Sequence, residues 1–427
     1  MSKLRLLHKF RLMNCFDKRF SLSDDVYLVT GTRSSAIYDL PTGDVYSVDS
    51  PFTRVLGLAL AGRTPQEIVN QVDNVNLYGI IEFLAKLVEQ GLGHWYQGQI
   101  RSAKSYRDLP IPPFDLRFAW LELTHNCNLY CIHCYTDSAS QLVTGQRLSM
   151  DEWGYLTSEL GRLGCSMIQL TGGEALMMNQ LTDLILTSRD NGIETIEVFS
   201  NLTLLTGGLL EFFSRQRVMI ATSLYGPSPQ IHDSITRVRG SFQTTVRSIQ
   251  QLVANGVSLR IGIVILPQNK DYIQETIQFA REELGVEQTE ASRVLRAGRG
   301  CLIACDEVTP QRLAFPWVTK EAFVARMSGH SCWGGKICIS PVGDVLPCPF
   351  TRDIALGNVR QQGVSAVISS DGLNEIWRLS KDKVETCRDC EYRYACFDCR
   401  PKAATLTGKP ANCRYDPYQS RMIEPEM

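Results

Sequence analysis

The sequence lacks the features that would place the protein in a membrane or on nucleic acid. No run of about 18 apolar residues occurs in its 427 residues, so we expect no transmembrane helix. The first 16 residues are basic and partly apolar, but without an unbroken apolar core or a small-residue cleavage site they do not indicate a signal peptide. A net charge of −1 favours neither nucleic acid nor an anionic membrane as partner. We therefore expect a cytoplasmic globular protein.

Cysteine is the residue present in excess. Of 15 cysteines, Cys15, Cys165, Cys301 and Cys305 are scattered, and we interpret them as inert or buried thiols, although the last two lie in a loop-like stretch that could border a site. The others form one group at positions 127, 131 and 134 and a second group at Cys332, Cys338, Cys348, Cys387, Cys390, Cys396, Cys399 and Cys413. Disulfide-rich scaffolds are short secreted chains, whereas this chain is long and repeats Cys-x-x-Cys. The pattern indicates metal ligation in a reducing compartment.

Residues 1–100 predict a small winged-helix-like module. Three short segments rich in Val, Ile and Tyr predict strands: 26–30, 35–40 and 44–49. Three helical patterns follow, at 51–62, 64–72 and 77–92. Thr64 before Pro65 marks the start of the second, and Gly91 marks the end of the third. The polar and then proline-rich stretch 101–115 predicts a linker.

Residues 116–310 alternate strand and helix patterns, which predicts a parallel α/β sheet. Ser149 and Glu152 form a capping box at the start of the first helix. Six segments predict strands: 117–123, 166–170, 195–199, 218–224, 259–266 and 287–291. Six units are too few for an eight-stranded barrel, so we expect a partial barrel or an open sheet. The last part, 326–427, predicts short elements and turns that metal centres would stabilise.

The first cysteine group, CNLYCIHC (127–134), directly follows the first of these strands. It therefore lies at the C-terminal edge of the sheet, where parallel α/β proteins carry their active sites. Three thiolates can hold three irons of a [4Fe–4S] cluster and leave the fourth iron open to a ligand. A zinc site completed by His125 or His133 is the alternative.

The second strand ends in TGGEAL (171–176). Gly172 and Gly173 would let the backbone approach a ligand and expose its amides, and Glu174 would accept a hydrogen bond from an amine. Alone this motif is a weak signal. Its position next to the cysteine motif makes it a strong one.

Together, CNLYCIHC and GGEAL resemble the radical S-adenosylmethionine (SAM) superfamily. The resemblance implies a (β/α)6 partial barrel and a cluster held by Cys127, Cys131 and Cys134, whose open iron chelates SAM. The reduced cluster then cleaves SAM to a 5′-deoxyadenosyl radical that removes a hydrogen atom from substrate. The resemblance also implies an electron donor such as flavodoxin or ferredoxin, and cofactor contacts from Gly172, Gly173, Glu174, Ser200, Asn201, Ser223 and Arg237. Many relatives carry Asp where Tyr225 stands.

The C-terminal cysteines resemble a SPASM domain, which implies two auxiliary [4Fe–4S] clusters and three clusters in all. One auxiliary cluster would take Cys332, Cys348 and Cys399, with Cys338 as a fourth ligand. The other would take four thiols: Cys387, Cys390, Cys396 and Cys413. The family usually spaces the pair Cys396 and Cys399 one residue further apart. A zinc ribbon, or one cluster with spare thiols, are the alternatives.

Residues 1–100 resemble the leader-binding module of enzymes that modify ribosomally made peptides. The resemblance implies that a precursor's leader adds as a strand at 44–49, with helix 77–92 as the other wall of the groove. A DNA-binding winged helix is disfavoured because Lys and Arg do not cluster on the helices.

The expected function is that of a radical SAM peptide maturase that forms a thioether or carbon–carbon crosslink. Peptide epimerisation or oxidation, and maturation of a folded protein side chain as in sulfatase-activating enzymes, are alternatives. A non-enzymatic electron carrier is disfavoured because it needs no cofactor pocket.

Overall fold

The computed structural model describes residues 15–100, 104–139, 147–303, 317–403, 405–410 and 413–423. Cys305 lies outside these ranges. The chain forms two compact units that do not follow chain order. The barrel unit comprises Pro113–Glu307 and Trp333–Trp377, and the composite unit comprises Met1–Pro112, Val308–Cys332 and Arg378–Met427. Within the described ranges, no helix is both long and apolar enough to cross a bilayer.

The barrel unit is built on a nine-stranded sheet in which six consecutive strands run parallel. These six strands neighbour one another in chain order: β6 (Phe118–Thr124), β7 (Met167–Gly172), β8 (Thr195–Phe199), β9 (Met219–Ser223), β10 (Leu259–Ile265) and β11 (Thr289–Arg293). Each corresponds to a segment that the sequence predicts as a strand. The prediction of an α/β fold with a (β/α)6 partial barrel is confirmed.

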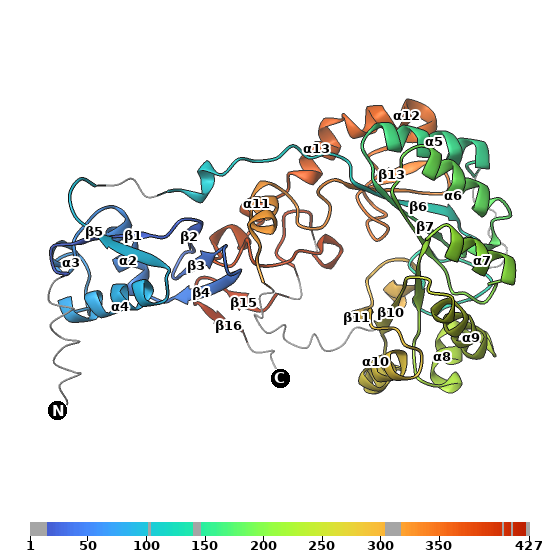
Figure 1. Ribbon diagram of the computed structural model, residues 1–427, viewed down its shortest axis with the longest axis horizontal. Helices are drawn as coiled ribbons and strands as arrows, with labels where there is room; N and C mark the ends of the chain where they lie inside the picture. The colour runs from blue at the N-terminus through green and yellow to red at the C-terminus, as the bar shows by residue number, and fades with distance from the viewer. Residues whose placement is uncertain are drawn as a thin grey trace. The chain divides into compact units, whose positions relative to one another are not determined.

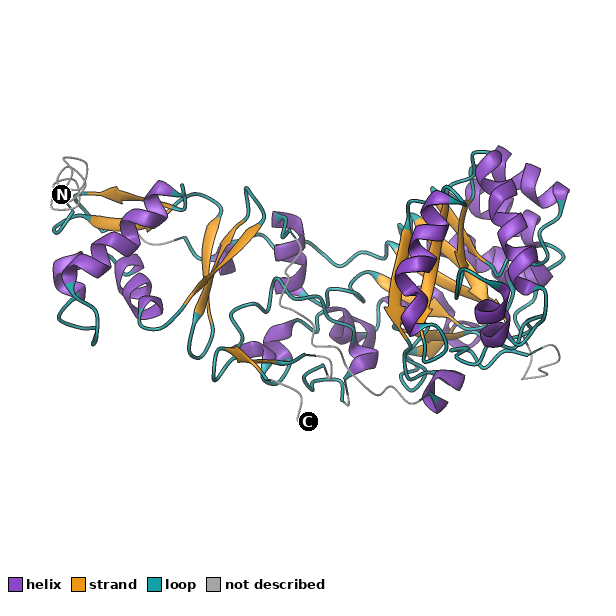
Figure 2. Cartoon of the chain, turned by 90° about the horizontal axis from the view of Figure 1, so that it is seen from below, coloured by secondary structure: helices purple, strands orange, loops and turns teal. Residues whose placement is uncertain are grey.

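Helices between these strands cover the outer side of the sheet (Figures 1 and 2). They are α5 (Met150–Arg162), α6 (Leu181–Asp190), α7 (Gly207–Arg215), α8 (Pro229–Thr236), α9 (Ser241–Ala254) and α10 (Ile273–Glu282), with single-turn helices η2 (Ala175–Met177), η3 (Lys270–Tyr272) and η4 (Gly298–Leu302). The capping box at α5 is present, because the Ser149 hydroxyl accepts from the Glu152 amide at 3.2 Å and the Glu152 carboxylate accepts from the Ser149 amide at 2.7 Å.

The segment that carries Cys338 and Cys348 extends the barrel sheet. β12 (Lys336–Ile339) pairs in parallel with β6, and β13 (Asp344–Leu346) and β14 (Gly357–Asn358) continue it antiparallel, before α12 (Val359–Ile368) and α13 (Asp371–Trp377). Arg352 anchors this extension, since its Nη1 donates to the fully buried carboxylate of Glu122 on β6 at 2.7 Å. The bidentate form of this pair compensates for the burial of two charges.

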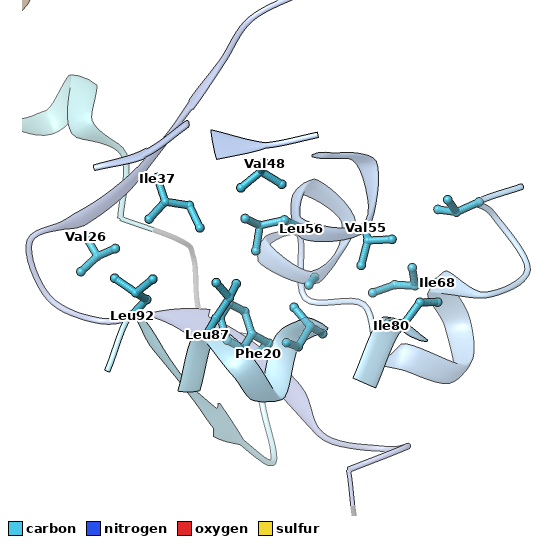
Figure 3. Close-up of a cluster of buried hydrophobic side chains, with 13 residues drawn as sticks. Phe20, Val26, Ile37, Val48, Val55, Leu56, Ile68, Ile80, Leu87 and Leu92 are labelled. Carbon is cyan, nitrogen blue, oxygen red and sulfur yellow. The ribbon is translucent and has the colours of Figure 1, made fainter. Parts of the chain in front are cut away.

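The first module belongs to the composite unit. Its antiparallel sheet of β2 (Val26–Thr30), β3 (Ser35–Asp39) and β4 (Asp44–Val48) is joined by α2 (Phe52–Leu60), α3 (Pro65–Ile68) and α4 (Leu77–Glu89). Apolar side chains from these elements form one core (Figure 3). The pair β1 (Arg19–Leu22) and β5 (Gly93–Tyr96) was not predicted, because strands of four residues are too short to show a pattern.

The C-terminal cysteine-rich segment packs on the first module within the composite unit. It contributes short elements only: η5 (Lys381–Lys383), η6 (Cys387–Asp389), η7 (Arg400–Lys402), β15 (Tyr415–Asp416) and β16 (Arg421–Met422), while α11 (Lys320–Ser328) and η1 (Tyr106–Asp108) lie earlier in the chain. Phe323 of α11 meets Tyr38 of β3 at a ring-centroid distance of 5.0 Å and Tyr394 at 5.2 Å. The Tyr38 hydroxyl also donates to the Glu391 carbonyl at 2.9 Å. The two ends of the sequence therefore share one core.

Candidate functional site

The three closely spaced cysteines lie in residues 125–139, which follow the end of β6 and are called the cysteine loop here. The backbone amide of Leu129 donates to the Cys127 sulfur at 3.4 Å, and the Ser138 amide donates to the Cys134 sulfur at 3.4 Å. Amide donors directed at sulfur favour the thiolate form, which is the form that binds metal. The loop backbone is thus arranged to support thiolate ligands.

Burial of these thiols makes a cation necessary if they are to ionise. Burial raises the pKa of Cys127 to about 11. It also raises the pKa of Cys131, and the neighbouring thiols of Cys134 and Cys127 raise it further. The three sulfurs are therefore near enough to repel one another as anions, and iron would supply the compensating charge. This donor set fits three irons of a [4Fe–4S] cluster.

The zinc alternative gains no support from the described residues. No group of three or more His, Cys, Asp or Glu side chains among them is placed to hold a single metal ion. His133 packs edge-on against Tyr225, with ring centroids 4.8 Å apart, and burial lowers its pKa to about 4. A cluster places each thiolate on a different iron, so its ligands need not converge on one point.

Gly172 and Gly173 bring the end of β7 against the backbone of the cysteine loop. A Cβ on Gly172 (φ +125°) would lie 2.4 Å from the Thr124 carbonyl oxygen, and one on Gly173 would lie 2.1 Å from that of Asn126. The Gly173 amide donates to the Thr124 carbonyl at 2.6 Å, and the Glu174 amide donates to the Asn126 carbonyl at 2.8 Å. These two amides therefore bond within the chain, and the contact of Gly172 and Gly173 with a ligand stays a prediction.

The carboxylate of Glu174 is held by donors from within the chain. The residue is fully buried, which raises its pKa, and its oxygens accept from the Ser200 hydroxyl at 2.6 Å, the Asn201 amide at 2.8 Å and the Leu176 amide at 2.9 Å. Its carboxylate joins the ends of β7 and β8. That Glu174 also accepts a hydrogen bond from a ligand's amine stays a prediction.

Asn201 links the end of β8 to the cysteine loop. Its side-chain nitrogen donates to the Asn128 side-chain oxygen at 2.9 Å and lies 3.9 Å from the Cys127 sulfur. Ser200 is almost fully buried, and its oxygen accepts from the Leu202 amide at 2.9 Å. Of this pair, Asn201 is the one beside the predicted cluster, and Ser200 supports the turn.

Ser223 ends β9 and hydrogen-bonds the hydroxyl of Tyr225. Burial raises the pKa of Tyr225 well above its ordinary value, and the thiols of Cys131, Cys134 and Cys127 raise it further, so a neutral phenol lies beside the cysteine loop. In the sequence, Tyr225 stands out only as a departure from the family pattern.

Arg237 caps α8 with an exposed side chain and a left-handed backbone (φ 62°). The two carbonyls before it accept from the cysteine loop, Thr236 from the Tyr130 amide and Ile235 from the Ile132 amide, each at 3.0 Å. Arg237 therefore flanks the loop. Arg299, which contacts the same loop from the end of β11, was missed because nothing near it in sequence connects it to the cysteines.

Four C-terminal cysteines line one cavity in the composite unit. Its lining includes all four thiols predicted to share a cluster: Cys387, Cys390, Cys396 and Cys413. Lys381 also lines it; burial alone would lower the pKa of this amine, but Cys396 and Asp398 raise it. A buried cation among four thiols fits an anionic [4Fe–4S] centre.

The other predicted auxiliary ligands are divided between the two units. Cys332 and Cys399 belong to the composite unit, and Cys338 and Cys348 to the barrel unit. Cys338 is fully buried, which raises the pKa of its thiol well above the ordinary value, with Cys348 among the groups that raise it further. These four thiols remain a predicted ligand set.

Comparison with known proteins agrees with this geometry. Residues 121–280 match the radical SAM superfamily, and residues 332–391 match the SPASM iron–sulfur cluster-binding domain. The chain is 27% identical over 332 residues to an AdoMet-dependent heme synthase of Methanosarcina barkeri, covering 68% of this chain and 92% of that protein. It is 26% identical over 347 residues to a PqqA peptide cyclase of Gluconobacter oxydans, covering 74% and 94%.

A third relative is the subtilosin biosynthesis protein AlbA of Bacillus subtilis, 25% identical over 311 residues and covering 66% of each chain. Among solved structures, Streptococcus suis SuiB bound to its precursor peptide SuiA has the same fold, with a TM-score of 0.55 at 14% identity over 92% of this chain and 100% of that one. The chain therefore carries a radical SAM domain at residues 121–280 and a SPASM iron–sulfur cluster-binding domain at residues 332–391.

Proposed function

We propose that this protein is a radical SAM maturase of a ribosomally made peptide, with the leader of the precursor bound by the first module. The observation that carries this proposal is the free edge of β4. In the sheet order β2-β3-β4, this strand pairs with β3 alone among the described residues. An extended peptide can add to such an edge through backbone hydrogen bonds.

The fold comparison favours a peptide over a small molecule. The likeness to SuiB covers 92% of the chain, so it takes in most of the first module as well as the barrel. The likeness to the heme synthase covers 68% of the chain. A small-molecule substrate is the second candidate because of that likeness, but it would give the first module no role.

The chain's own residues prepare the site for this chemistry. Cys127, Cys131 and Cys134 would hold the first cluster, which with SAM supplies the electron and the 5′-deoxyadenosyl radical. The glycines and Glu174 fix the ends of β7 and β8 around the cysteine loop, and Tyr225 supplies a buried hydroxyl beside it. Burial of Glu174 and Tyr225 excludes bulk solvent from this part of the site, which limits side reactions.

A crosslink removes two hydrogens from the peptide, and the proposal accounts for both. One leaves as an atom to the deoxyadenosyl radical. The other would leave as a proton to solvent and an electron, and an auxiliary cluster held by the four cysteines around Lys381 would be the acceptor of that electron. The reaction is then a net oxidation of the peptide. A flavodoxin or ferredoxin would reduce the first cluster, in the cytoplasm, where thiols stay reduced.

Mass spectrometry of the co-expressed precursor peptide tests the proposal. The candidate precursor is the short open reading frame beside the gene, and the full-length protein is compared with a variant lacking residues 1–100. A loss of two hydrogens indicates a crosslink, and an unchanged mass with altered stereochemistry indicates epimerisation. The proposal fails if the truncated variant modifies the full-length precursor at the wild-type rate. It also fails if the enzyme couples SAM cleavage to the modification of a small molecule and modifies no peptide.

A further inference from the structure

A single guanidinium connects the cysteine loop to the far end of the parallel strands. Arg299 lies in η4, which follows β11, the last of the six parallel strands, whereas the cysteine loop follows β6, the first. The residue is 8% exposed. A buried arginine is costly unless its donors are satisfied, so its partners show what it holds.

Arg299 contacts the cysteine loop through its backbone amide and its guanidinium. Its Nε donates to the Cys131 carbonyl at 2.8 Å and its backbone amide donates to the Cys134 carbonyl at 2.9 Å. Its Nη2 donates to the Ser138 carbonyl at 2.9 Å, and its Nη1 pairs with Asp137 at 2.7 Å. The guanidinium also lies over the Tyr130 ring, 4.1 Å from the centroid.

The residues around Arg299 are shaped for this close approach. A Cβ on Gly298 (φ +51°) would lie 2.4 Å from the Cys134 carbonyl oxygen, and one on Gly300 would lie 2.3 Å from that of Leu295. Both positions therefore require glycine if the backbone is to keep its path. The segment brings Arg299 against the loop at a place where a larger residue would push it away.

Two of the bound carbonyls belong to cysteines of the predicted cluster, so the contacts act on the direction of two thiols. A guanidinium offers its donors in a rigid planar fork, which fixes the peptide groups that it binds better than a single ammonium can. Groups that orient metal ligands tune both the geometry of a site and its reduction potential.

We propose that Arg299 is a positioning residue for SAM: by fixing the carbonyls of Cys131 and Cys134, it orients the first cluster so that its open iron meets the incoming cofactor. The proposal rests on the assignment of that cluster within the proposed function. It does not depend on the identity of the substrate, because the test below measures SAM binding and cleavage in the absence of peptide.

Arg299→Lys and Arg299→Gln test the proposal, with Arg296→Gln as the matched control because Arg296 is exposed in the same segment. Each protein is reconstituted anaerobically. Iron is counted, and the electron paramagnetic resonance signal of the reduced protein is recorded with and without SAM. The KM and kcat for SAM in uncoupled cleavage to 5′-deoxyadenosine and the midpoint potential of the first cluster are then measured.

We expect both Arg299 variants to keep their iron but to raise the KM for SAM about tenfold, with a weaker spectral change on SAM addition. Lysine retains the positive charge, so it should keep the midpoint potential near that of wild type, while glutamine should make it more negative. The control should match wild type throughout. Wild-type KM and spectra in both variants would overturn the proposal, as would a loss of iron in both that accounts for all lost activity. A protein that passes this test and modifies no peptide would leave the proposal standing and remove the proposed function.

Discussion

The carboxylate of Glu174 accepts a hydrogen bond from the hydroxyl of Ser200 at 2.6 Å, and this buried contact joins β7 to β8 beside the cysteine loop. Both residues are predicted to contact SAM. Their oxygens also bond within the chain, and the Glu174 carboxylate holds the backbone amide of Asn201, whose side-chain nitrogen lies 3.9 Å from the Cys127 sulfur.

Glu174→Gln should therefore lower the unfolding free energy of the protein more than it weakens SAM binding. All three partners of the carboxylate are donors, so a side-chain amide would face at least one of them with its own donor. We expect a loss of about 1–3 kcal/mol in unfolding free energy, measured by denaturant titration of the apoprotein. The exposed Glu194→Gln serves as control. Wild-type stability with a raised KM for SAM would instead indicate direct contact.

Replacing Cys127, Cys131 and Cys134 together with Ala should abolish SAM cleavage in a folded protein. The thiols are the only ligands predicted for the first cluster, while the two auxiliary clusters should keep about eight irons. Iron counting after anaerobic reconstitution and chromatography of 5′-deoxyadenosine check both statements. Continued cleavage would disprove the ligand assignment, and about two zinc ions in place of iron would show that the C-terminal segment is a zinc module.

Cys390→Ser should harm the protein more broadly than Cys127→Ser. Cys390 lines the cavity of the composite unit and packs against the core that contains Tyr38 and Tyr394. Loss of the centre that this thiol supports should lower soluble yield and expose the aromatic core, because the short elements around it rely on metal for stability. Soluble fraction and dye binding to exposed apolar surface are the measurements. Equal yields for the two variants would argue against a structural centre there.

Proline scanning of β4 tests leader binding. Neighbouring residues of a strand direct their amides to opposite sides, so of Tyr46→Pro and Ser47→Pro one removes a bond to β3 and the other an amide at the free edge. The edge substitution should weaken binding of a labelled leader by about 1 kcal/mol or more, with SAM cleavage unchanged. Tyr46→Phe and Ser47→Ala control for the lost side chains. Wild-type anisotropy titrations for both proline variants would exclude this edge as the binding site.

His232 should make the barrel unit sensitive to mild acid. Burial lowers its pKa to about 4, from an unfolded value near 6.5. Below about pH 6.5 the histidine binds a proton in the unfolded chain but stays neutral in the folded chain. Its contribution to the free energy of unfolding is therefore fully present above that pH and falls progressively toward pH 4. His232→Asn, which keeps an acceptor for the Tyr225 amide, should lose less thermal stability between pH 7 and pH 5 than wild type. Parallel losses would show that this histidine is not responsible.

The parts of the fold that the sequence predicted are those governed by local pattern. The strands β6 to β10 are mainly apolar segments that alternate with helical patterns, whereas β11 is polar. The N-cap of Thr64 and the capping box of Ser149 are each complete within four residues. The position of the cysteine loop followed from its place after the first strand. The inward direction of Glu174 did not follow, because its partners come from another strand end.

Long-range features were also beyond the sequence. Arg299 and Cys131 are 168 positions apart, and no periodicity connects them. The division of the C-terminal cysteines between two units depends on β12 pairing with β6, and a strand of four residues gives little indication of its partner.

The aromatic core of the composite unit also bears on how the protein is synthesised. The Tyr38 hydroxyl accepts from the Ala395 amide, 357 positions later in the chain. A ribosome therefore makes β3 long before it makes the residues that cover it. Until then Tyr38, Ala36 and Val29 lack the covering that Tyr392 and Tyr394 provide in the finished core. Such a nascent chain carries an apolar face through most of its translation, which makes it a natural client for chaperones that bind exposed apolar segments.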